Sequence, residues 1–390
     1  MCRMRSFAAG LWCLWVGSLF ACSSGSSGQG AGGTGAGGAG AAGGRSSASA
    51  GSGGASTASA AGAGNVAGAS AEATDVTGPL DTTSGAGAPG SMGSDVRVDA
   101  GEPPLTQGVC PPGPFAANPV PGGAAPEVVC SGMTFTEGPV WFEERNTLFF
   151  SDFQLNNPAL GRIMSFTPGG QCEPFIATAG TNGLVIAPDG NLLGARHSDQ
   201  TLTVFDLETQ QPTVLVADNA GASFNSPNDI AVRSDGNLYF TDPTFLLGNR
   251  DSELPARAYR RDPSGALSVI DQTGNTNGIT LSPDETRLYL SHLGGQSNII
   301  VFDVDAAGAV TNPQPFVGVG SDGMVVDCAG NLYITQGGVR VYDPDGELIT
   351  TIAAPGAANV AFGGPERRTL YTTAAEELLA VELAIPGLPY

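Results

Sequence analysis

The amino-acid sequence predicts an all-β protein whose main domain is a six-bladed β-propeller. A short motif returns six times, each copy opening with a polar or acidic residue and continuing as an apolar strand, a turn and a second apolar strand. The six opening residues are Glu137, Asn182, Asn228, Asn277, Asp322 and Asn359, at spacings of 45, 46, 49, 45 and 37 residues. Such spacings are typical of four-stranded propeller blades and are too long for single-strand repeats.

The third copy, Ser226–Pro243, shows why each motif predicts a β-hairpin. Ile230 and Val232 alternate with smaller or polar neighbours, Asp235-Gly236-Asn237 forms a turn signal, and a second alternating run follows. The fourth copy has the same alternation, at Ile279, Leu281, Leu288 and Leu290. A period of two residues is the signature of a strand, and helical periodicity is weak throughout.

Segments outside the repeats have predicted roles in closing and covering the ring. Residues 110–126 are rich in Pro and Gly and predict an irregular lead-in. The following segment, Glu127-Val128-Val129-Cys130, predicts a strand that closes the ring by pairing with the last blade, because a propeller must protect its free edges. The longer loop Thr244–Pro255 is expected to cover part of the channel mouth.

The amino terminus predicts export. Arg3 and Arg5 precede an apolar run at residues 7–21, which is short for a membrane span and fits a signal peptide over residues 1–21. The run ends in Leu-Phe-Ala-Cys, which resembles a bacterial lipobox, so we expect Cys22 to become the acylated first residue. The alternatives are an ordinary cleaved signal or a cysteine that happens to end the apolar run. Ser23 after the cysteine favours, by resemblance, the outer membrane.

Residues 22–109 predict a disordered linker. The segment is almost entirely small residues such as Gly, Ala, Ser and Thr and has too few large apolar side chains to form a core. It would act as a flexible tether ahead of a propeller over residues 110–390. The predicted location is therefore extracytoplasmic, either at the bacterial outer membrane or cell surface as a lipoprotein or in the periplasm, with membrane contact only through the lipid anchor.

The charge balance argues against a nucleic-acid partner. The net charge is −21 and the chain has only 16 Lys and Arg residues, whereas binding to phosphates depends on clustered basic side chains. Most of the acidic residues are expected to lie on a solvated surface. We also expect the protein to be a monomer.

Four cysteines follow Cys22, namely Cys110, Cys130, Cys172 and Cys328. Export permits disulfides, and a bond between Cys110 and Cys130 could fasten the lead-in to the propeller. Sequence alone leaves the connectivity open. The chain has no Cys-x-x-Cys motif and only two histidines, which argues against a cysteine and histidine zinc site.

Four of the repeat openings predict a metal site. In a propeller the innermost strands begin at one rim of the central channel, so Glu137, Asn228, Asn277 and Asp322 should face a common point. Two carboxylates and two amides are hard oxygen donors suited to Ca²⁺, with Mg²⁺, Mn²⁺ or Zn²⁺ as alternative ions. Two negative charges balance a divalent ion and leave it electrophilic, as Lewis-acid catalysis requires.

A purely structural interpretation of these openings stays available. Asn-Gly and Asp-Gly pairs are common turn formers, so Asn277-Gly278 or Asp322-Gly323 taken singly would be interpreted as a turn. Asn182 and Asn359 occupy the same repeat position and are not assigned to the metal. Only the joint occurrence of four oxygen-bearing side chains in phase favours the metal site.

Together the motifs resemble those of the gluconolactonase / senescence marker protein (regucalcin) family over about Phe135 to Val381. The matching segments are Glu-Gly-Pro-Val-Trp at 137–141, Asn-Ser-Pro-Asn-Asp at 225–229, Ser-Asp-Gly-Asn-Leu-Tyr-Phe-Thr-Asp-Pro at 234–243, Asn-Gly-Ile-Thr-Leu-Ser-Pro-Asp-Glu at 277–285 and Asp-Gly-Met-Val-Val-Asp at 322–327. Two positions depart from the family pattern. Ser321 stands where bacterial members commonly have Pro, and Ser226 where some animal members carry a substrate-binding Arg.

The resemblance implies a calcium-dependent lactonase on a six-bladed propeller. It implies that Glu137, Asn277 and Asp322 are metal ligands. It also implies that Asn228 either contacts the substrate or completes the metal coordination. It also implies that Asp322 is the catalytic acid/base, which would accept a proton from water attacking the carbonyl of a sugar lactone such as glucono-1,5-lactone while the metal stabilises the oxyanion.

Further candidates and alternatives complete the prediction. Arg196 and His197 follow the inner strand of the second repeat and are candidates for substrate contact, with a surface or packing role as the alternative. A second enzymatic hypothesis is phosphotriester hydrolysis on the same metal, in which an Asp attacks phosphorus directly. A third is a surface-tethered binding propeller without turnover, in which calcium only stiffens the ring.

Overall fold

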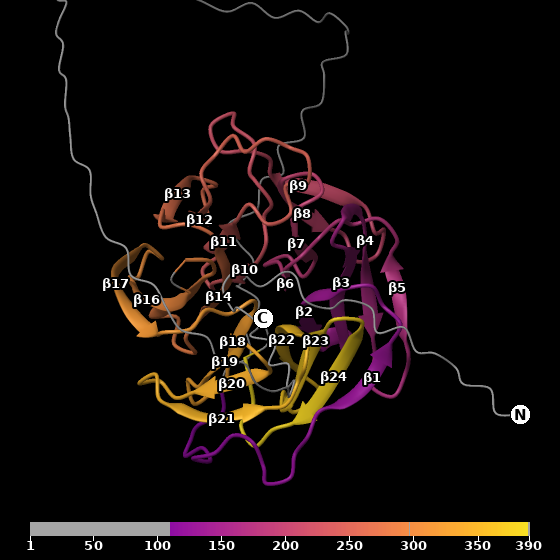
Figure 1. Cartoon of the computed structure of the whole chain (residues 1–390), viewed down its shortest axis with the longest axis vertical. Coiled ribbons are helices and arrows are strands. Elements are labelled where there is room, and N and C mark those ends of the chain that lie inside the picture. The colour runs from indigo at the N-terminus through magenta and orange to yellow at the C-terminus, as the bar shows by residue number, and fades with distance from the viewer. Residues whose placement is uncertain (1–109, 296, 389–390) are drawn as a thin grey trace, which may run out of the picture. The chain divides into compact units, whose positions relative to one another are not determined.

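The computed structural model describes residues 110–388, residue 296 excepted. The predicted signal peptide, the linker over residues 22–109 and Cys22 lie outside these residues. In the described part, six four-stranded antiparallel sheets surround a central axis (Figure 1). This confirms the predicted six-bladed propeller. No helix in the described part is long and apolar enough to cross a membrane.

Each blade runs outward from an inner strand to an outer edge strand, and the first five blades follow the chain in order. Blade 1 contains β2 (Thr136–Phe142), β3 (Thr147–Gln154), β4 (Asn157–Phe166) and β5 (Cys172–Ile176), with a 3-10 turn η1 (Glu143–Arg145). Blade 2 contains β6 (Leu184–Ile186), β7 (Leu192–Arg196), β8 (Thr201–Phe205) and β9 (Pro212–Val216). Blade 3 contains β10 (Ile230–Val232), β11 (Leu238–Asp242), β12 (Arg257–Arg261) and β13 (Leu267–Asp271).

The remaining blades close the ring. Blade 4 contains β14 (Thr276–Leu281), β15 (Arg287–His292), β16 (Asn298–Val304) and β17 (Val310–Val317). Blade 5 contains β18 (Met324–Val326), β19 (Leu332–Thr335), β20 (Val339–Tyr342) and β21 (Leu348–Ile352). Blade 6 contains β22 (Ala357–Gly363), β23 (Thr369–Ala374), β24 (Glu377–Glu382) and, on its outer edge, β1 (Glu127–Ser131). The pairing of β1 with β24 confirms the predicted closure of the ring.

The alternating residues pack between blades. Ile230 lies opposite Phe240 in the β10–β11 register, and both are buried against residues of blade 2 such as Leu193. The intervening Ala231 and Tyr239 face the other way, into a cluster with blade 4. Both faces of an inner hairpin are therefore apolar, because each blade packs on two neighbours. Burial of this apolar surface is the main stabilising contribution to the ring.

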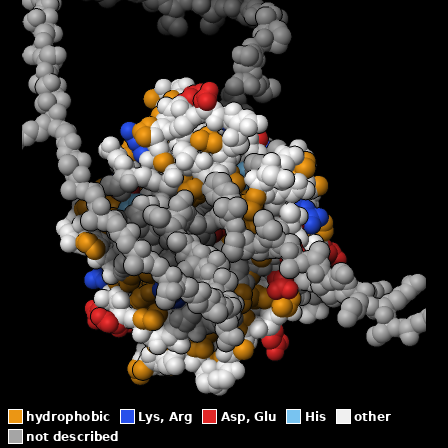
Figure 2. Space-filling model, in the orientation of Figure 1, with side chains coloured by type: hydrophobic (Ala, Val, Ile, Leu, Met, Phe, Trp, Pro, Cys, Tyr) orange, Lys and Arg blue, Asp and Glu red, His pale blue; other side chains and the backbone are white. Residues whose placement is uncertain are grey.

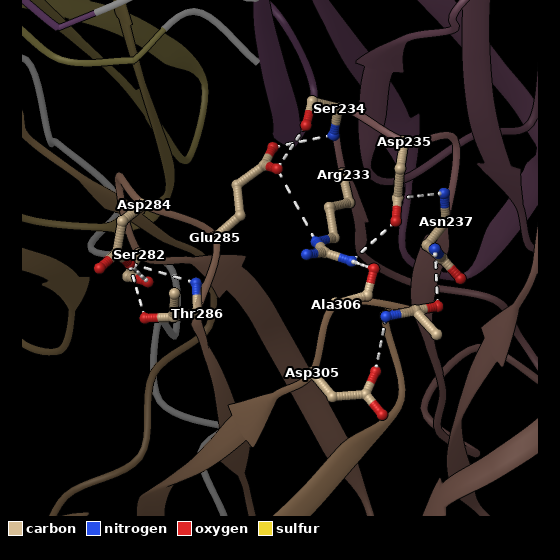
Figure 3. Close-up of polar contacts among 12 residues, drawn as sticks. Arg233, Ser234, Asp235, Asn237, Ser282, Asp284, Glu285, Thr286, Asp305 and Ala306 are labelled. Carbon is tan, nitrogen blue, oxygen red and sulfur yellow. Dashed lines mark hydrogen bonds and ion pairs between the residues drawn. The ribbon is translucent and has the colours of Figure 1, made fainter.

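Polar contacts join blades 3 and 4 at the ends of the inner strands that lie farthest from the repeat openings. Arg233 pairs with Asp235 at 2.7 Å, and its Nη1 donates to the carbonyl oxygen of Ala306 in the β16–β17 turn at 3.4 Å (Figure 3). The amide of Ser234 donates to Oε1 of Glu285 at 2.8 Å. These contacts between turns hold blades 3 and 4 in register. On the face of the molecule drawn in Figure 2, charged side chains of either sign are scattered among neutral and apolar ones.

Two disulfides connect the four cysteines that follow Cys22, and they correct the suggested Cys110–Cys130 bond. Cys110 is bonded to Cys328, and Cys130 is bonded to Cys172. The physical reason is the path of the lead-in, which packs Cys110 and Phe115 against blade 5, whereas Cys130 lies in β1 beside blade 1. The second bond joins blade 6 to blade 1 across the point where the ring closes.

The C-terminal segment after β24 packs across one end of the ring. The amide of Cys328 donates to the carbonyl oxygen of Pro386, and the amide of Gly387 donates to that of Arg367, both at 2.8 Å. Leu388 lines the central cavity at this end. The inner strands begin at the other end, where the repeat openings lie.

Candidate metal and active site

The repeat openings meet at one end of the central channel. Each opening residue lies within two residues of the start of an inner strand, and the six inner strands surround the axis (Figure 1). A cavity in this channel is lined by polar residues that include Asp229 and Asn359 and by apolar residues such as Met324 and Phe362. Buried polar side chains thus lie at the mouth of a channel with apolar walls.

The glycine after an opening residue allows neighbouring blades to touch. A Cβ atom on Gly183 would lie 2.7 Å from the carbonyl oxygen of Asn228, and one on Gly323 would lie 2.0 Å from Cγ of Asn359. The same holds for Gly278, whose Cβ would lie 2.5 Å from the carbonyl oxygen of Asp322. These contacts are too close for any side chain. The Asn-Gly and Asp-Gly pairs therefore serve close packing around the axis rather than the isolated turns that the structural interpretation assumed.

Three carboxylates at this hub, those of Glu137, Asp229 and Asp322, lie close enough to influence one another electrostatically. Burial raises the pKa of Glu137 well above its usual value, and the negative charge of Asp322 raises it further. Burial also raises the pKa of Asp229 to about 7, against the lowering effect of hydrogen bonds from the amides of Ile230 and Ile279. Buried acids that repel one another favour a bound cation or retained protons.

Asn277 is bonded directly to Asp322. Its Nδ2 donates to Oδ1 of Asp322 at 2.7 Å, which leaves the amide oxygen of Asn277 free of that bond. Desolvation raises the pKa of Asp322 to about 6, while the bond from Asn277 acts in the opposite direction. Asp322 is partly exposed, whereas Glu137 and Asn277 are buried. The structure thus brings together three of the four predicted metal ligands and leaves Asp322 accessible.

The fourth predicted ligand, Asn228, lies at the same rim. Its side chain is buried. Its backbone amide donates to the carbonyl oxygen of Thr241 at 2.9 Å, and its backbone carbonyl oxygen accepts the amide of Gly183 at 2.7 Å. These backbone bonds fix Asn228 beside Asp229, between blades 2 and 3. Asn182 is also buried at its blade opening, where its carbonyl oxygen accepts the hydroxyl of Ser151 at 2.7 Å.

Two hub residues were not among the predicted ligands. Asp229 follows Asn228, and the charge of Asp322 raises its pKa further, while the polar side chain of Asn359 lowers the pKa of both Glu137 and Asp229. The available signal was the acidic second residue of the third opening, since Gly or Val occupies that place in the other five. For Asn359 the signal was its phase in the repeat, which it shares with the predicted ligands although it was not assigned to the metal.

Arg196 and His197 are held by other contacts. Nε of Arg196 donates to the carbonyl oxygen of Ala179 at 2.6 Å, and its Nη1 pairs with Asp199 at 2.7 Å. His197 is fully buried, and its ring packs edge-on against Phe153 with centroids 4.7 Å apart. These contacts agree with a packing role, the alternative to substrate contact.

The loop between β11 and β12, residues 244–255, is fastened to both neighbouring blades. Nη1 of Arg250 donates to the carbonyl oxygen of Ser198 in blade 2 at 2.9 Å, and the amide of Thr244 donates to Oδ1 of Asn275 before blade 4 at 3.1 Å. The loop therefore bridges three blades on the side where the inner strands begin.

The donor set at the hub fits a divalent cation. Within residues 110–388 as described, no three His, Cys, Asp or Glu side chains could hold a metal by themselves. A metal at the hub would therefore need amide oxygens such as that of Asn277 in addition to carboxylates. The electrostatics agree, because the pKa values of Glu137, Asp229 and Asp322 are all raised and a divalent charge would favour their ionised forms.

The fold and the hub together define a six-bladed β-propeller with an oxygen-rich site at one channel mouth. Within this class, the chain belongs to the SMP-30/Gluconolactonase/LRE-like family, whose model matches residues 135–376. A gluconolactonase of Zymomonas mobilis is 34% identical over 287 residues, which cover 65% of this chain and 80% of that protein. A pentonolactonase of Haloferax volcanii is 27% identical over 264 residues, or 64% of this chain and 84% of that protein.

Solved structures agree with this assignment. A gluconolactonase from Xanthomonas campestris superimposes with a TM-score of 0.63 and 31% identity, covering 72% of this chain and 99% of that one. The calcium-binding protein regucalcin from Agrobacterium tumefaciens shares the fold, with a TM-score of 0.56 and 21% identity over 70% of this chain and 95% of that one. The resemblance drawn from the sequence motifs is thereby confirmed.

Proposed function

We propose that this protein is a lactonase that hydrolyses an aldonolactone such as glucono-1,5-lactone and needs a divalent cation, Ca²⁺ in the first place. The observation that carries the proposal is the cluster of Glu137, Asp229 and Asp322 at the hub, in a chain whose relatives are a gluconolactonase and a pentonolactonase. Clustered carboxylates with raised pKa values at a channel mouth are typical of a functional site.

The cation would be held by Glu137, Asn277 and Asp322, with Asn228 as a further oxygen donor or a substrate contact. When bound, it would supply Lewis-acid stabilisation of the negative charge that develops on the lactone carbonyl oxygen. Asp229 and Asn359 lie beside these ligands and would orient them through hydrogen bonds and charge.

Asp322 has the properties of a general base. With a pKa of about 6 it is mostly ionised at neutral pH, and it is partly exposed at the hub. It would accept a proton from the water that attacks the carbonyl carbon of the lactone. The ring carbon–oxygen bond then breaks, and the departing ring oxygen takes up a proton to leave an open hydroxy acid.

A lactone panel tests this proposal. We expect hydrolysis of glucono-1,5-lactone by the purified protein, loss of activity with a chelator and recovery with Ca²⁺. Asp322→Asn should lower kcat by about 100-fold or more while the fold persists, since the general base is lost. Asp345→Asn, in the exposed β20–β21 turn, is the matched control. A folded, metal-loaded protein that opens no lactone would contradict the proposal and favour the binding propeller.

We also propose that the protein is exported and anchored through Cys22. The lipobox-like residues before Cys22 support this, and so do the disulfides Cys110–Cys328 and Cys130–Cys172, since such bonds persist in oxidising compartments. Cys22→Ala should move the protein from the membrane to the soluble fraction, whereas Cys13→Ala, earlier in the apolar run, should not. Membrane partition that is unchanged by Cys22→Ala would refute the anchor.

A further inference from the structure

Asp322 is flanked by two residues whose backbones are held by buried hydroxyl groups. On its N-terminal side, the amide of Ser321 donates to Oγ of Ser291 at 2.7 Å, and that hydroxyl donates to the carbonyl oxygen of Ser321 at 2.7 Å. Ser291 lies in β15 of the preceding blade. Blade 4 thus holds the residue immediately before Asp322 through both of its backbone polar groups.

On the C-terminal side, Thr335 of β19 has the corresponding role. The amide of Gly323 donates to Oγ1 of Thr335 at 2.9 Å, and Oγ1 lies 2.7 Å from the carbonyl oxygen of Ala358, which precedes Asn359. One hydroxyl therefore connects the residue after Asp322 with the opening of the next blade.

The side chain of Ser321 links the two flanks. Its Oγ accepts the amide of Thr335 at 2.9 Å and donates to the carbonyl oxygen of Gly323. Ser321 and Ser291 are completely buried, and Thr335 is 4% exposed. Burying a hydroxyl group without a hydrogen bond costs free energy. Each of these three hydroxyls is therefore held in place by its partners, and together they form one connected network.

Similar hydroxyls recur at this position in the second strand of other blades. Ser151 donates to the carbonyl oxygen of Asn182, Thr241 accepts the amide of Asp229, and Thr373 accepts the amide of Asn359. Blade 2 has Ala195 at this position and uses backbone bonds alone. Five of the six blades thus hold the backbone at or beside an opening residue through a hydroxyl. Hydroxyls from two blades act at Asp322, through Ser321 and Gly323, and at Asn359, through Ala358 and Asn359 itself.

We propose that Ser291, Ser321 and Thr335 are positioning residues that fix Asp322 for catalysis. This inference rests on the proposed function. It also gives a role to Ser321, which departs from the Pro that the family resemblance leads one to expect. A proline has no amide hydrogen to donate to Ser291, so this chain fixes the residue before Asp322 by hydrogen bonds instead of a ring-constrained backbone.

The test uses Thr335→Val, which keeps the shape and removes the hydroxyl, Ser291→Ala, and Thr335→Ser, which restores the hydroxyl. The control is Thr203→Val in β8, which removes a buried hydroxyl pair with Thr201 in a third strand away from the hub. For each variant, kcat, KM, the Ca²⁺ dissociation constant and amide hydrogen exchange over residues 321–323 are measured on the full protein.

We expect Thr335→Val and Ser291→Ala to lower kcat by about 10-fold or more with KM within about 2-fold, because a misplaced base affects the transition state most. Exchange at residues 321–323 should accelerate by about 10-fold, the effect of losing roughly 1.4 kcal/mol of local protection. Thr335→Ser should restore both values, and Thr203→Val should change neither.

Unchanged exchange and kcat in both Thr335→Val and Ser291→Ala would overturn the inference, as would an equal loss in Thr203→Val. If Thr335→Val does not fold, Ser291→Ala and Thr335→Ser decide the question. If the wild-type protein opens no lactone, the proposed function fails. Hydrogen exchange, which needs no turnover, then decides separately whether the hydroxyls hold the backbone around Asp322.

Discussion

Adding one methyl group at Gly323 should disable the site. A Cβ atom there would lie 2.0 Å from both Cγ and Oδ1 of Asn359 and 2.6 Å from its Nδ2. Ordinary contact begins at 3.4 Å, so the amide of Asn359 would have to move by about 1.4 Å (3.4 − 2.0). That amide lies near enough to Glu137 and Asp229 to lower the pKa of both, so its displacement would affect two of the three hub carboxylates.

The magnitude follows from these contacts. Overpacking of a tight site costs about 1–3 kcal/mol, so Gly323→Ala should still fold. A displacement of about 1 Å near the reacting groups can lower the rate by about 100-fold. We therefore expect kcat/KM for glucono-1,5-lactone to fall by about that factor. The Ca²⁺ dissociation constant, measured by calorimetry, should rise by about 10-fold or more, because polar groups that orient metal ligands change metal affinity by about this factor.

The control is Gly318→Ala in the segment between β17 and β18. A Cβ on Gly318 would have no neighbour within 4 Å, and this glycine has an ordinary backbone conformation. It should retain the activity and Ca²⁺ affinity of the wild-type protein. If Gly323→Ala behaved like Gly318→Ala in both measurements, the contact between Gly323 and Asn359 would not be what holds the hub together.

Three further predictions follow from the same structure. The double change Cys130→Ser and Cys172→Ser should lower the free energy of unfolding by about 2–4 kcal/mol in denaturant titrations. The reason is that it removes a disulfide that restricts the unfolded chain between residues 42 apart. A change below about 0.5 kcal/mol would contradict this. In metal-free protein, burial lets Asp229, Asp322 and also Asp242, outside the hub, keep protons that the unfolded chain releases near pH 4. The melting temperature should therefore fall as pH rises from about 4 to 7, and saturating Ca²⁺ should weaken the part of that fall that comes from Asp229 and Asp322. A fall that saturating Ca²⁺ leaves unchanged would refute the assignment of the two hub aspartates to the metal site. Arg250→Met removes hydrogen bonds from the β11–β12 loop to blade 2 and should make that loop cleave faster under limited proteolysis than in the wild-type protein.

The sequence was sufficient to predict the ring because its signals are local and repeated. The alternation at Ile230 and Val232, and the turn at Asp235-Gly236-Asn237, each specify a hairpin within a few residues. Phase in the repeat then placed the openings at one rim. The pairing of β1 with β24 was predictable for a general reason, since a propeller leaves one blade to be completed by the chain's first strand.

Contacts between blades were harder to predict because no local pattern specifies them. Asp229 joins the hub through its charge near Asp322 and its bond to the amide of Ile279, which belongs to another blade. The partner of Cys110 lies 218 residues away, so its identity depends on how the lead-in crosses the ring. Buried hydroxyl residues such as Thr335 cannot be told from ordinary strand residues in the sequence, because their hydrogen-bond partners lie in the next blade.

The disulfide between Cys110 and Cys328 also determines how mechanical force would enter the domain. Cys328 follows β18, the inner strand of blade 5, at the end opposite Asp322. A pull on the chain ahead of Cys110 would pass through the sulfur bridge into an interior strand before it reached β1. The edge strand that completes blade 6 would therefore be spared from peeling, and tension on the domain would be taken up at the end opposite the repeat openings.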